Sequence, residues 1–196
     1  MADIKPEHKG ILLIISGPSG VGKSTVCARL VGRLDAFLSI SATTRGRREG
    51  EVDGKNYHFI SRQQFQERLD RGAFLEYAQV YGGHCYGTPA EPVQKALNAG
   101  KVMILEIEIE GTIQVVRRFP EAVTIYIMAP TPAEQKNRIF GRHQDSAEAI
   151  EDRLERADGE IRYAKDSGVY RHFLVNETIQ GTVDTIVRIV REKQRA

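Results

Sequence analysis

Short apolar runs alternate with amphipathic segments along most of the chain. Residues 11–16 (ILLIIS) and 123–129 (VTIYIMA) are continuous apolar runs rich in β-branched side chains, which is typical of strands buried on both faces of a parallel sheet. Residues 101–111 (KVMILEIEIEG) and 172–176 (HFLVN) predict two more strands. Because predicted strands and helices alternate, we expect an α/β fold with a parallel sheet flanked by helices.

Helical periodicity and capping signals separate these strands. Val26, Leu30 and Leu34 fall on one face of a predicted helix that follows residue 23. A Thr followed three residues later by a Glu occurs at 88–91 and at 131–134, and both patterns predict capping boxes that open helices. The helices expected after residue 60 span about 61–71, 88–98, 111–118, 131–140, 147–165 and 180 onwards, with an interruption at 141–147.

The segment 36–87 breaks the alternation of strands and helices. Its first part, residues 36–60, is rich in Arg, Gly and Thr and shows little helical period. We therefore expect a single domain whose core, about 10–37 and 88–196, carries an inserted α/β lobe at about 38–87. A helical lid is expected at about 138–155.

Composition narrows the class of protein. The 196 residues suit one domain, and a net charge of +2 gives no case for a nucleic-acid or membrane partner. Cys27 and Cys85 form no C-x-x-C pair, so zinc and redox motifs have no support. The polar N-terminus does not resemble a secretory signal, and the cytoplasm is the expected compartment.

The strongest chemical signal is the phosphate-binding motif G-x-x-x-x-G-K-[ST], formed by Gly17, Gly22, Lys23 and Ser24. It follows a predicted buried strand and opens a predicted helix, which is the context that the motif requires. The loop N–H groups and the helix N-terminus attract phosphates, Lys23 reaches the β- and γ-phosphates, and the Ser24 hydroxyl can bind Mg²⁺. The expected ATP-binding residues here are Gly17, Pro18, Ser19, Gly20, Val21, Gly22, Lys23, Ser24 and Thr25.

A phosphate-binding loop alone does not distinguish a kinase from a GTPase or an ATPase motor. The guanine-reading N-K-x-D of GTPases does not occur in the chain. A motor would need more elements than this length leaves room for. A small-molecule kinase is favoured.

Arginines gather at two places that are distant in the sequence. Arg45, Arg47 and Arg48 lie in the insert, and a second group lies around the interruption in the late helices. One guanidinium can bind two phosphate oxygens at once. Two groups of arginines therefore fit an enzyme with two phosphate sites. The alternative is a solvated charged face. The second group comprises Arg138, Arg142 and Arg153.

Taken together, these motifs resemble the guanylate kinase family over about residues 10–193. The resemblance implies transfer of the γ-phosphoryl group of ATP to GMP, giving ADP and GDP, by direct in-line transfer with Mg²⁺. The matching runs are GPSGVGKST (17–25), SISATTRGRREGEVDGKNYHF (39–59), FLEYAQ (74–79), YGTP (86–89), LEIEIEG (105–111), RIFGR (138–142) with Arg153, and VN (175–176).

The resemblance also implies a role for individual residues of the acceptor site. Glu76 would accept hydrogen bonds from guanine N1–H and the 2-amino group, Thr88 would contact O6, and Glu108 would lie near the 2-amino edge. A carboxylate satisfies two adjacent donors of guanine but would face the N1 acceptor of adenine, so a buried site rejects the wrong base. The residues expected to hold the GMP phosphate are Ser41, Arg45, Arg48, Tyr57 and Tyr86.

On the donor side, the resemblance implies an arginine lid that closes over ATP and excludes water. Asn176 resembles a residue near the adenine pocket. The expected catalytic residues are Lys23, Arg48, Arg138, Arg142 and Arg153.

One segment departs from the family pattern. Glu106 and Glu108 stand where the family usually has an Asp-x-Asp. Residues two apart in a strand point to the same face, so both carboxylates can still reach the site. Each side chain is one methylene longer, which changes the contacts expected for Glu108.

Two other functions remain alternatives at this point. One is an inactive guanylate-kinase-like module that binds phosphopeptides, although such modules typically have a degraded phosphate loop. The other is a related kinase with a different acceptor, against which Glu76 and Thr88 argue. The expected partners are ATP and GMP, without nucleic acid or membrane, and the sequence leaves the oligomeric state open.

Overall fold

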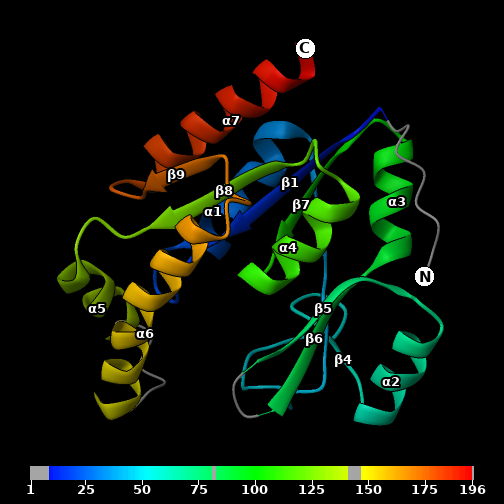
Figure 1. Ribbon diagram of the computed structural model, residues 1–196, viewed down its shortest axis with the longest axis horizontal. Helices are drawn as coiled ribbons and strands as arrows, with labels where there is room; N and C mark the ends of the chain where they lie inside the picture. The colour runs from blue at the N-terminus through cyan, green and yellow to red at the C-terminus, as the bar shows by residue number, and fades with distance from the viewer. Residues whose placement is uncertain (1–8, 81–82, 141–146, 196) are drawn as a thin grey trace.

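The computed structural model describes residues 9–80, 83–140 and 147–195, and within these ranges it omits the side chains of residues 80, 139–140 and 147–156. In the described part, the larger sheet has the order β2-β7-β1-β8-β9, and every neighbouring pair is parallel (Figure 1). Its strands are β1 (Ile11–Ser16), β2 (Phe37–Leu38), β7 (Val102–Glu106), β8 (Val123–Met128) and β9 (His172–Val175).

Helices cover both faces of this sheet. Leu13 and Ile15 of β1 pack into the cluster that contains α1 and α7, while Leu12 and Ile14 pack against α3 and α4. Both alternating sets are apolar because both faces are buried, as parallel sheets require. The helices are α1 (Lys23–Leu34), α7 (Ile179–Arg195), α3 (Ala90–Asn98), α4 (Ile109–Arg118) and α6 (Ala147–Asp166), the last of which packs partly against α4 and β8.

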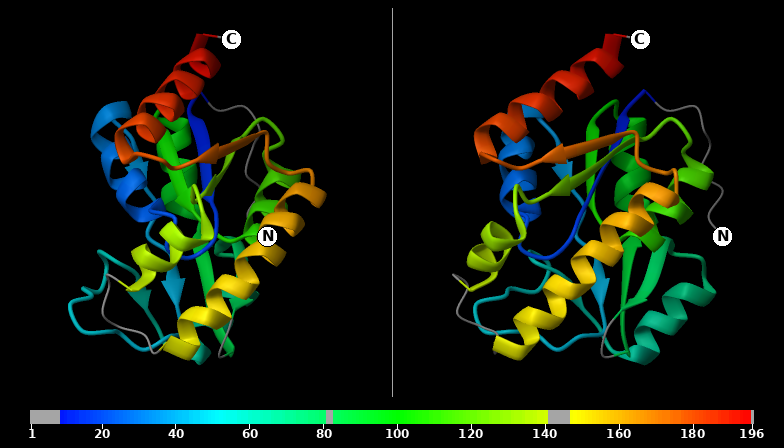
Figure 2. Two further views of the ribbon diagram at one scale, coloured as in Figure 1. Left: turned by 90° about the vertical axis from the view of Figure 1, so that its left-hand side faces the viewer. Right: turned by 60° about the vertical axis from the view of Figure 1, so that its left-hand side comes forward.

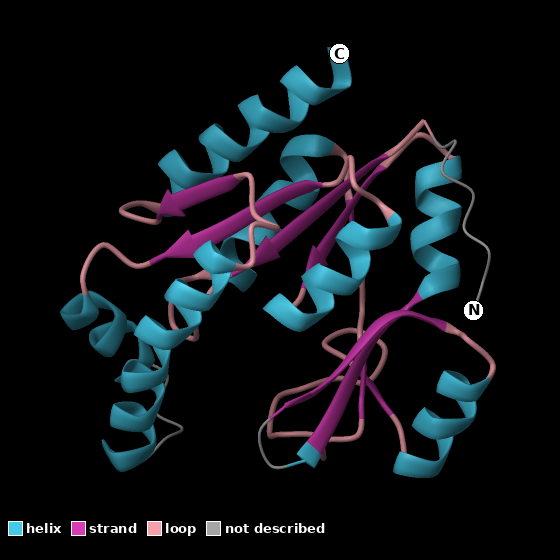
Figure 3. Ribbon diagram, viewed as in Figure 1, coloured by secondary structure: helices cyan, strands magenta, loops and turns pink. Residues whose placement is uncertain are grey.

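A second, smaller sheet lies at one end of the larger one (Figure 3). Its order is β4-β3-β6-β5, with one parallel pair and two antiparallel pairs. Phe65 of the adjoining helix stacks on Phe74 with ring centroids 4.6 Å apart, which attaches that helix to the sheet. These elements are β3 (Ala42–Thr43), β4 (His58–Phe59), α2 (Arg62–Asp70), β5 (Phe74–Val80) and β6 (His84–Pro89).

The predicted fold class is confirmed. The predicted strands at 11–16, 123–129 and 172–176 match β1, β8 and β9 within one residue. Two boundaries differ: β7 ends at Glu106, and α4 begins at Ile109 instead of at 111. Only Ile107 and the extended N-cap residue Glu108 separate the strand from the helix.

The capping box expected at 88–91 is wrong. Thr88 is the penultimate residue of β6, and its hydroxyl donates to the Glu76 carboxylate at 2.6 Å instead of capping a helix. Pro89 occupies the N-cap position of α3 without a side-chain bond. For the box at 131–134, the first half is confirmed, because the Glu134 N–H donates to the Thr131 hydroxyl at 3.1 Å.

The helix pair α5 (Pro132–Phe140) and α6 lies at the same end of the larger sheet as the smaller sheet (Figure 1 and Figure 2). Residues 141–146 of the predicted interruption lie outside the described residues. None of the helices in the described ranges has the length and apolar character that a membrane span needs.

Candidate active site

The phosphate-binding loop connects the end of β1 to the start of α1, as the motif predicts. Gly17 has a φ of 147°, and a Cβ there would lie 2.2 Å from the Ile127 carbonyl oxygen of the neighbouring strand. Gly22, at φ 93°, is the left-handed residue from which α1 begins. Only glycine combines these conformations with so close an approach of backbones. The loop therefore keeps its shape through tertiary contacts as well as through its own sequence.

Two side chains at the start of α1 contact different groups. The Lys23 ammonium donates to the carbonyl oxygens of Gly17 and Pro18 and so lies across the loop. The Ser24 hydroxyl donates to Glu106 at 2.8 Å, at the end of the adjacent strand β7. A hydroxyl and a carboxylate oxygen side by side are the kind of hard ligands that Mg²⁺ prefers.

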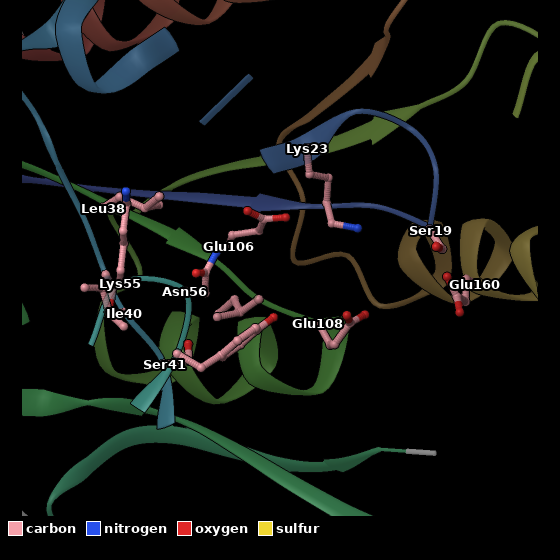
Figure 4. Close-up of a pocket in the computed structure, with 13 residues that line it drawn as sticks. Ser19, Lys23, Leu38, Ile40, Ser41, Lys55, Asn56, Glu106, Glu108 and Glu160 are labelled. Atoms are coloured by element: carbon pink, nitrogen blue, oxygen red, sulfur yellow. The ribbon is translucent and has the colours of Figure 1, made fainter. Parts of the chain in front are cut away.

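A cavity of about 330 Å³ extends from this loop toward the smaller sheet. Figure 4 shows Glu106 and Asn56 next to each other in the lining of this cavity, with Lys23 and Ser41 on either side of them in that view. Its polar and charged lining residues are Ser19, Lys23, Ser39, Ser41, Lys55, Asn56, Tyr57, Glu106, Glu108 and Glu160. The structure thus brings residues of the phosphate loop, the insert and the β7–α4 junction to one space.

Both carboxylates of the Glu106-Ile107-Glu108 segment line this cavity, as expected. They reach it by different routes, however. Glu106 is the last residue of β7, whereas Glu108 is the extended N-cap residue of α4. A negative charge at a helix N-terminus is favourable because it faces the positive end of the helix dipole.

A second polar cluster surrounds Arg45 in the insert. Its guanidinium donates to both carboxylate oxygens of Glu51, at 2.7 and 3.0 Å, and its Nε donates to the Tyr86 hydroxyl at 3.2 Å. The guanidinium carbon also lies 5.5 Å from the centre of the Tyr57 ring. The backbone N–H of Arg48 donates to the same Glu51 carboxylate at 2.7 Å. Three of the five residues expected to hold the GMP phosphate are therefore adjacent.

The two tyrosine hydroxyls in this cluster can donate hydrogen bonds to a phosphate. Burial raises the pKa of Tyr57 to about 12, so its hydroxyl stays protonated at neutral pH and can donate. Tyr86 accepts from Arg45, which leaves its own O–H to donate elsewhere. The rings of the two tyrosines meet edge to face, 5.7 Å apart. Because Tyr57 also lines the cavity, it links the cluster to the phosphate loop side.

A buried carboxylate lies behind these residues. Glu76 on β5 is 5% exposed, and one of its oxygens accepts from both the backbone N–H and the hydroxyl of Thr88. Desolvation raises the pKa of Glu76 to about 7, against the Thr88 donors, and the Glu108 charge adds to the rise. The other oxygen lies against Gly111 of α4, where a Cβ would come within 2.4 Å.

The predicted donor-side residues are only partly described. The Arg138 guanidinium donates to the Asn176 carbonyl at 3.0 Å, and with Gly20, Gly22 and Thr25 it lines a second pocket beside the phosphate loop. Arg142 lies outside the described residues, and the Arg153 side chain is not described.

Asn176 is fully buried, and both polar atoms of its side chain are engaged within the protein. The amide nitrogen donates to the Val21 carbonyl at 2.7 Å, and the amide oxygen accepts from the Thr182 hydroxyl at 2.8 Å. Asn176 is therefore attached to the phosphate loop itself.

Sequence reasoning assigned no role to several residues that contact the site. Glu51 lies in the run 39–59 that resembles the family, but no role was predicted for it. Gln135, which donates to the Ser19 carbonyl at 2.7 Å, lies in none of the quoted motifs. Gly111 stood at the junction of a predicted strand and a predicted helix, and its packing against Glu76 was not predicted. The cavity lining of Lys55, Asn56 and Glu160 was also not anticipated.

Comparisons with known proteins agree with this geometry. The family model described as Guanylate kinase matches residues 9–193. A guanylate kinase of Clostridium perfringens is 42% identical over 191 residues, 97% of this chain and 87% of the relative. One of Thermus thermophilus is 43% identical over 187 residues, 95% of this chain and 83% of the relative.

The solved structures agree with the sequences. The crystal structure of guanylate kinase from Anaplasma phagocytophilum has a TM-score of 0.78 at 30% identity and covers 100% of this chain and 90% of its own. With the family model matched over nearly all of the chain, this protein belongs to the guanylate kinase family.

Proposed function

We propose that the protein transfers the γ-phosphoryl group of ATP to GMP, giving ADP and GDP. The observation that carries the choice of acceptor is the buried Glu76 carboxylate, whose bonded partners are the two donors of Thr88. Guanine presents two adjacent donors, N1–H and the 2-amino group. The Glu76 oxygen that Thr88 does not contact can accept from them. Adenine presents an acceptor at the same place, which would leave a buried group unpaired and costs about 1–3 kcal/mol or more.

The acceptor lobe, about residues 38–87, would hold GMP by its two ends. The Arg45 cluster would bind the 5′-phosphate with Tyr57, Tyr86, Ser41 and Arg48. Glu76 and Thr88 would read the base, with Glu108 near its 2-amino edge. Support comes from the adjacency of Arg45, Tyr57 and Tyr86 and from that of Glu76 and Thr88.

The donor would bind on the phosphate loop. Backbone N–H groups of residues 17–25 would surround the phosphates, and Lys23 would exchange its bonds to loop carbonyls for bonds to phosphate oxygens. Lys23 would then stabilise the charge that develops as the phosphoryl group moves between nucleotides. In-line transfer requires the GMP phosphate oxygen to approach the γ-phosphorus opposite the leaving oxygen of ADP, in the cavity between the loop and the insert.

The residues present fit a Mg²⁺ ion that arrives with ATP. The Ser24 hydroxyl and the Glu106 carboxylate are 2.8 Å apart beside the loop, and Mg²⁺ is usually held by one or two such oxygens together with phosphates and water. The ion would neutralise charge on the phosphates and help orient them. Glu106 takes this position with one more methylene than an aspartate would have.

Residues from about 138 to 155 would form a lid over the bound ATP. Arg138, Arg142 and Arg153 would bring positive charge to the γ-phosphate when ATP is bound. The position of Arg138 beside the second pocket supports its part in this role. A contact of Asn176 with adenine stays a prediction. The proposed partners are ATP and GMP as free nucleotides, and the proposed compartment is the cytoplasm.

An assay of ADP release with Mg·ATP and each of GMP, AMP, CMP and UMP tests the function. We expect turnover with GMP and at least about 100-fold lower kcat/KM for AMP, given the cost of an unpaired buried group. Glu76→Gln should lower kcat/KM for GMP selectively, because an amide presents a donor where guanine has donors. No ADP release with any monophosphate would instead favour the inactive phosphopeptide-binding module.

A further inference from the structure

Two side-chain amides hold the carbonyl groups of the phosphate loop from outside it. Gln135 of α5 donates through Nε2 to the Ser19 carbonyl at 2.7 Å, across 116 positions of sequence. Asn176, just after β9, donates through Nδ2 to the Val21 carbonyl at 2.7 Å, across 155 positions. We infer that Gln135 and Asn176 form an amide clamp that presets the loop for ATP phosphates.

Peptide geometry explains how the clamp would act. In a trans peptide, the carbonyl of one residue and the N–H of the next point in opposite directions. Holding the Ser19 and Val21 carbonyls toward the two amides therefore turns the N–H groups of Gly20 and Gly22 the other way. Both glycines have positive φ, at 82° and 93°, so no Cβ resists that orientation. Successive inward N–H groups are what an anion-binding loop requires.

Both amides belong to buried residues, and that of Asn176 has a second side-chain contact. Gln135 is 5% exposed, and its backbone N–H donates to the Thr131 carbonyl in the first turn of α5. Asn176 is fully buried, and the Thr182 hydroxyl donates to its amide oxygen, which directs the nitrogen toward Val21. A Cβ on Gly22 would lie 2.8 Å from that nitrogen, so the contact leaves no room for adjustment.

The clamp also joins the loop to the proposed lid. Arg138, one turn beyond Gln135 on α5, donates to the carbonyl of Asn176 at 3.0 Å. The two clamp residues are thus connected to each other through α5, the helix that opens the lid segment. Gln135 and Asn176 are positioning residues on this interpretation, because they act on ATP through the loop backbone.

The first test removes the donors without changing the volume greatly. Gln135→Met keeps the length of the side chain but cannot donate, and Thr182→Val removes the hydroxyl that orients Asn176. We expect each to raise the KM for ATP at least fivefold, to weaken ADP binding equally by calorimetry, and to leave the KM for GMP within twofold. Thr182→Ser should restore the wild-type KM for ATP, because it restores the hydroxyl.

Gln114→Met is a matched control. Its amide makes a bond of the same kind and length, 2.7 Å to the Tyr77 carbonyl, away from the phosphate loop. It should leave the KM for ATP unchanged. A melting curve for each variant establishes that it folds. If Gln135→Met does not fold, Thr182→Val alone tests the clamp.

The inference rests on ATP binding to the loop, so its failure must be separable from that of the proposed function. If wild-type protein binds ADP and turns over GMP, but both folded variants keep the KM for ATP within twofold, the clamp is wrong and the function stands. Equal increases in both KM values, with a lower melting temperature, would show a structural role only. If the wild type neither binds ADP nor turns over, the function itself fails.

Discussion

The Glu51 carboxylate accepts hydrogen bonds from both terminal nitrogens of Arg45, at 2.7 and 3.0 Å, and from the backbone N–H of Arg48 at 2.7 Å. One acidic residue therefore organises the turn that carries both arginines expected to bind the GMP phosphate. The Arg45 guanidinium, in return, lowers the pKa of the Glu51 carboxyl below its ordinary value. Charge-assisted bidentate pairs of this kind fix the plane of the guanidinium.

Replacing Glu51 by Ala should therefore raise the KM for GMP about tenfold and leave the KM for ATP unchanged. This corresponds to the lower end of the roughly 1.5–3 kcal/mol that a hydrogen bond to a charged group contributes. Steady-state kinetics with each substrate varied in turn measures the split. Glu49→Gln is the control, because it removes an equal charge from an exposed neighbour in the same turn. A lower KM for GMP would show that Glu51 competes with the phosphate instead of orienting Arg45.

Glu76 should give GMP use a pH dependence near neutrality. Burial raises its pKa to about 7, so it is ionised above that pH and protonated below it. Because only the ionised form accepts both guanine donors, the KM for GMP should rise about tenfold per pH unit below 7. The KM for ATP should lack this step.

Glu76→Gln is the control for that profile. The GMP phosphate itself titrates near pH 6, and the amide variant retains this titration while losing the carboxyl. The difference between the two profiles isolates Glu76. Identical pH dependence in both proteins would contradict the assignment.

Gly111→Ala should disturb base recognition from the far side of the site. The added Cβ would lie 2.4 Å from the Glu76 oxygen that Thr88 does not contact, so the carboxylate must move. We expect the KM for GMP to rise more than tenfold with a smaller change in the KM for ATP. Gly32→Ala, in α1 with open space around the new Cβ, is the control and should stabilise its helix by about 1 kcal/mol.

Glu106→Gln should increase the Mg²⁺ concentration needed for half-maximal activity about tenfold, since an amide oxygen carries no charge to attract the ion. Ser24→Ala, which removes the partner hydroxyl at 2.8 Å, should act in the same direction. Titrating Mg²⁺ at constant ATP measures both effects. Glu110→Gln, an exposed carboxylate in the first turn of α4, should leave the Mg²⁺ requirement as it is.

The elements of the fold could be predicted because their signals are local. The run at 11–16 is apolar at every position but the last, and the parallel sheet buries it on both faces. The Ser61 hydroxyl caps α2 by accepting from the Gln64 N–H, and the Ser61 N–H donates in return to the Gln64 side-chain oxygen, so this signal comes from residues three apart in sequence. Thr88 shows where local reasoning failed, because its tertiary partner Glu76 took the hydroxyl that a cap would have used.

The amino-acid sequence by itself determined the phosphate loop and the order of strands and helices, and through its family resemblance it predicted the acceptor-site side chains. Each of these depends on neighbours within a few positions or on a motif with fixed spacing. Only the tertiary structure decided what holds those side chains: Glu51 on Arg45, Gly111 against Glu76, and Gln135 on the Ser19 carbonyl. Gly111 and Gln135 act on segments distant in the sequence, and even Glu51 needed the turn to fold. Such partners have no fixed spacing, so the sequence pattern did not show which group each of these residues would contact.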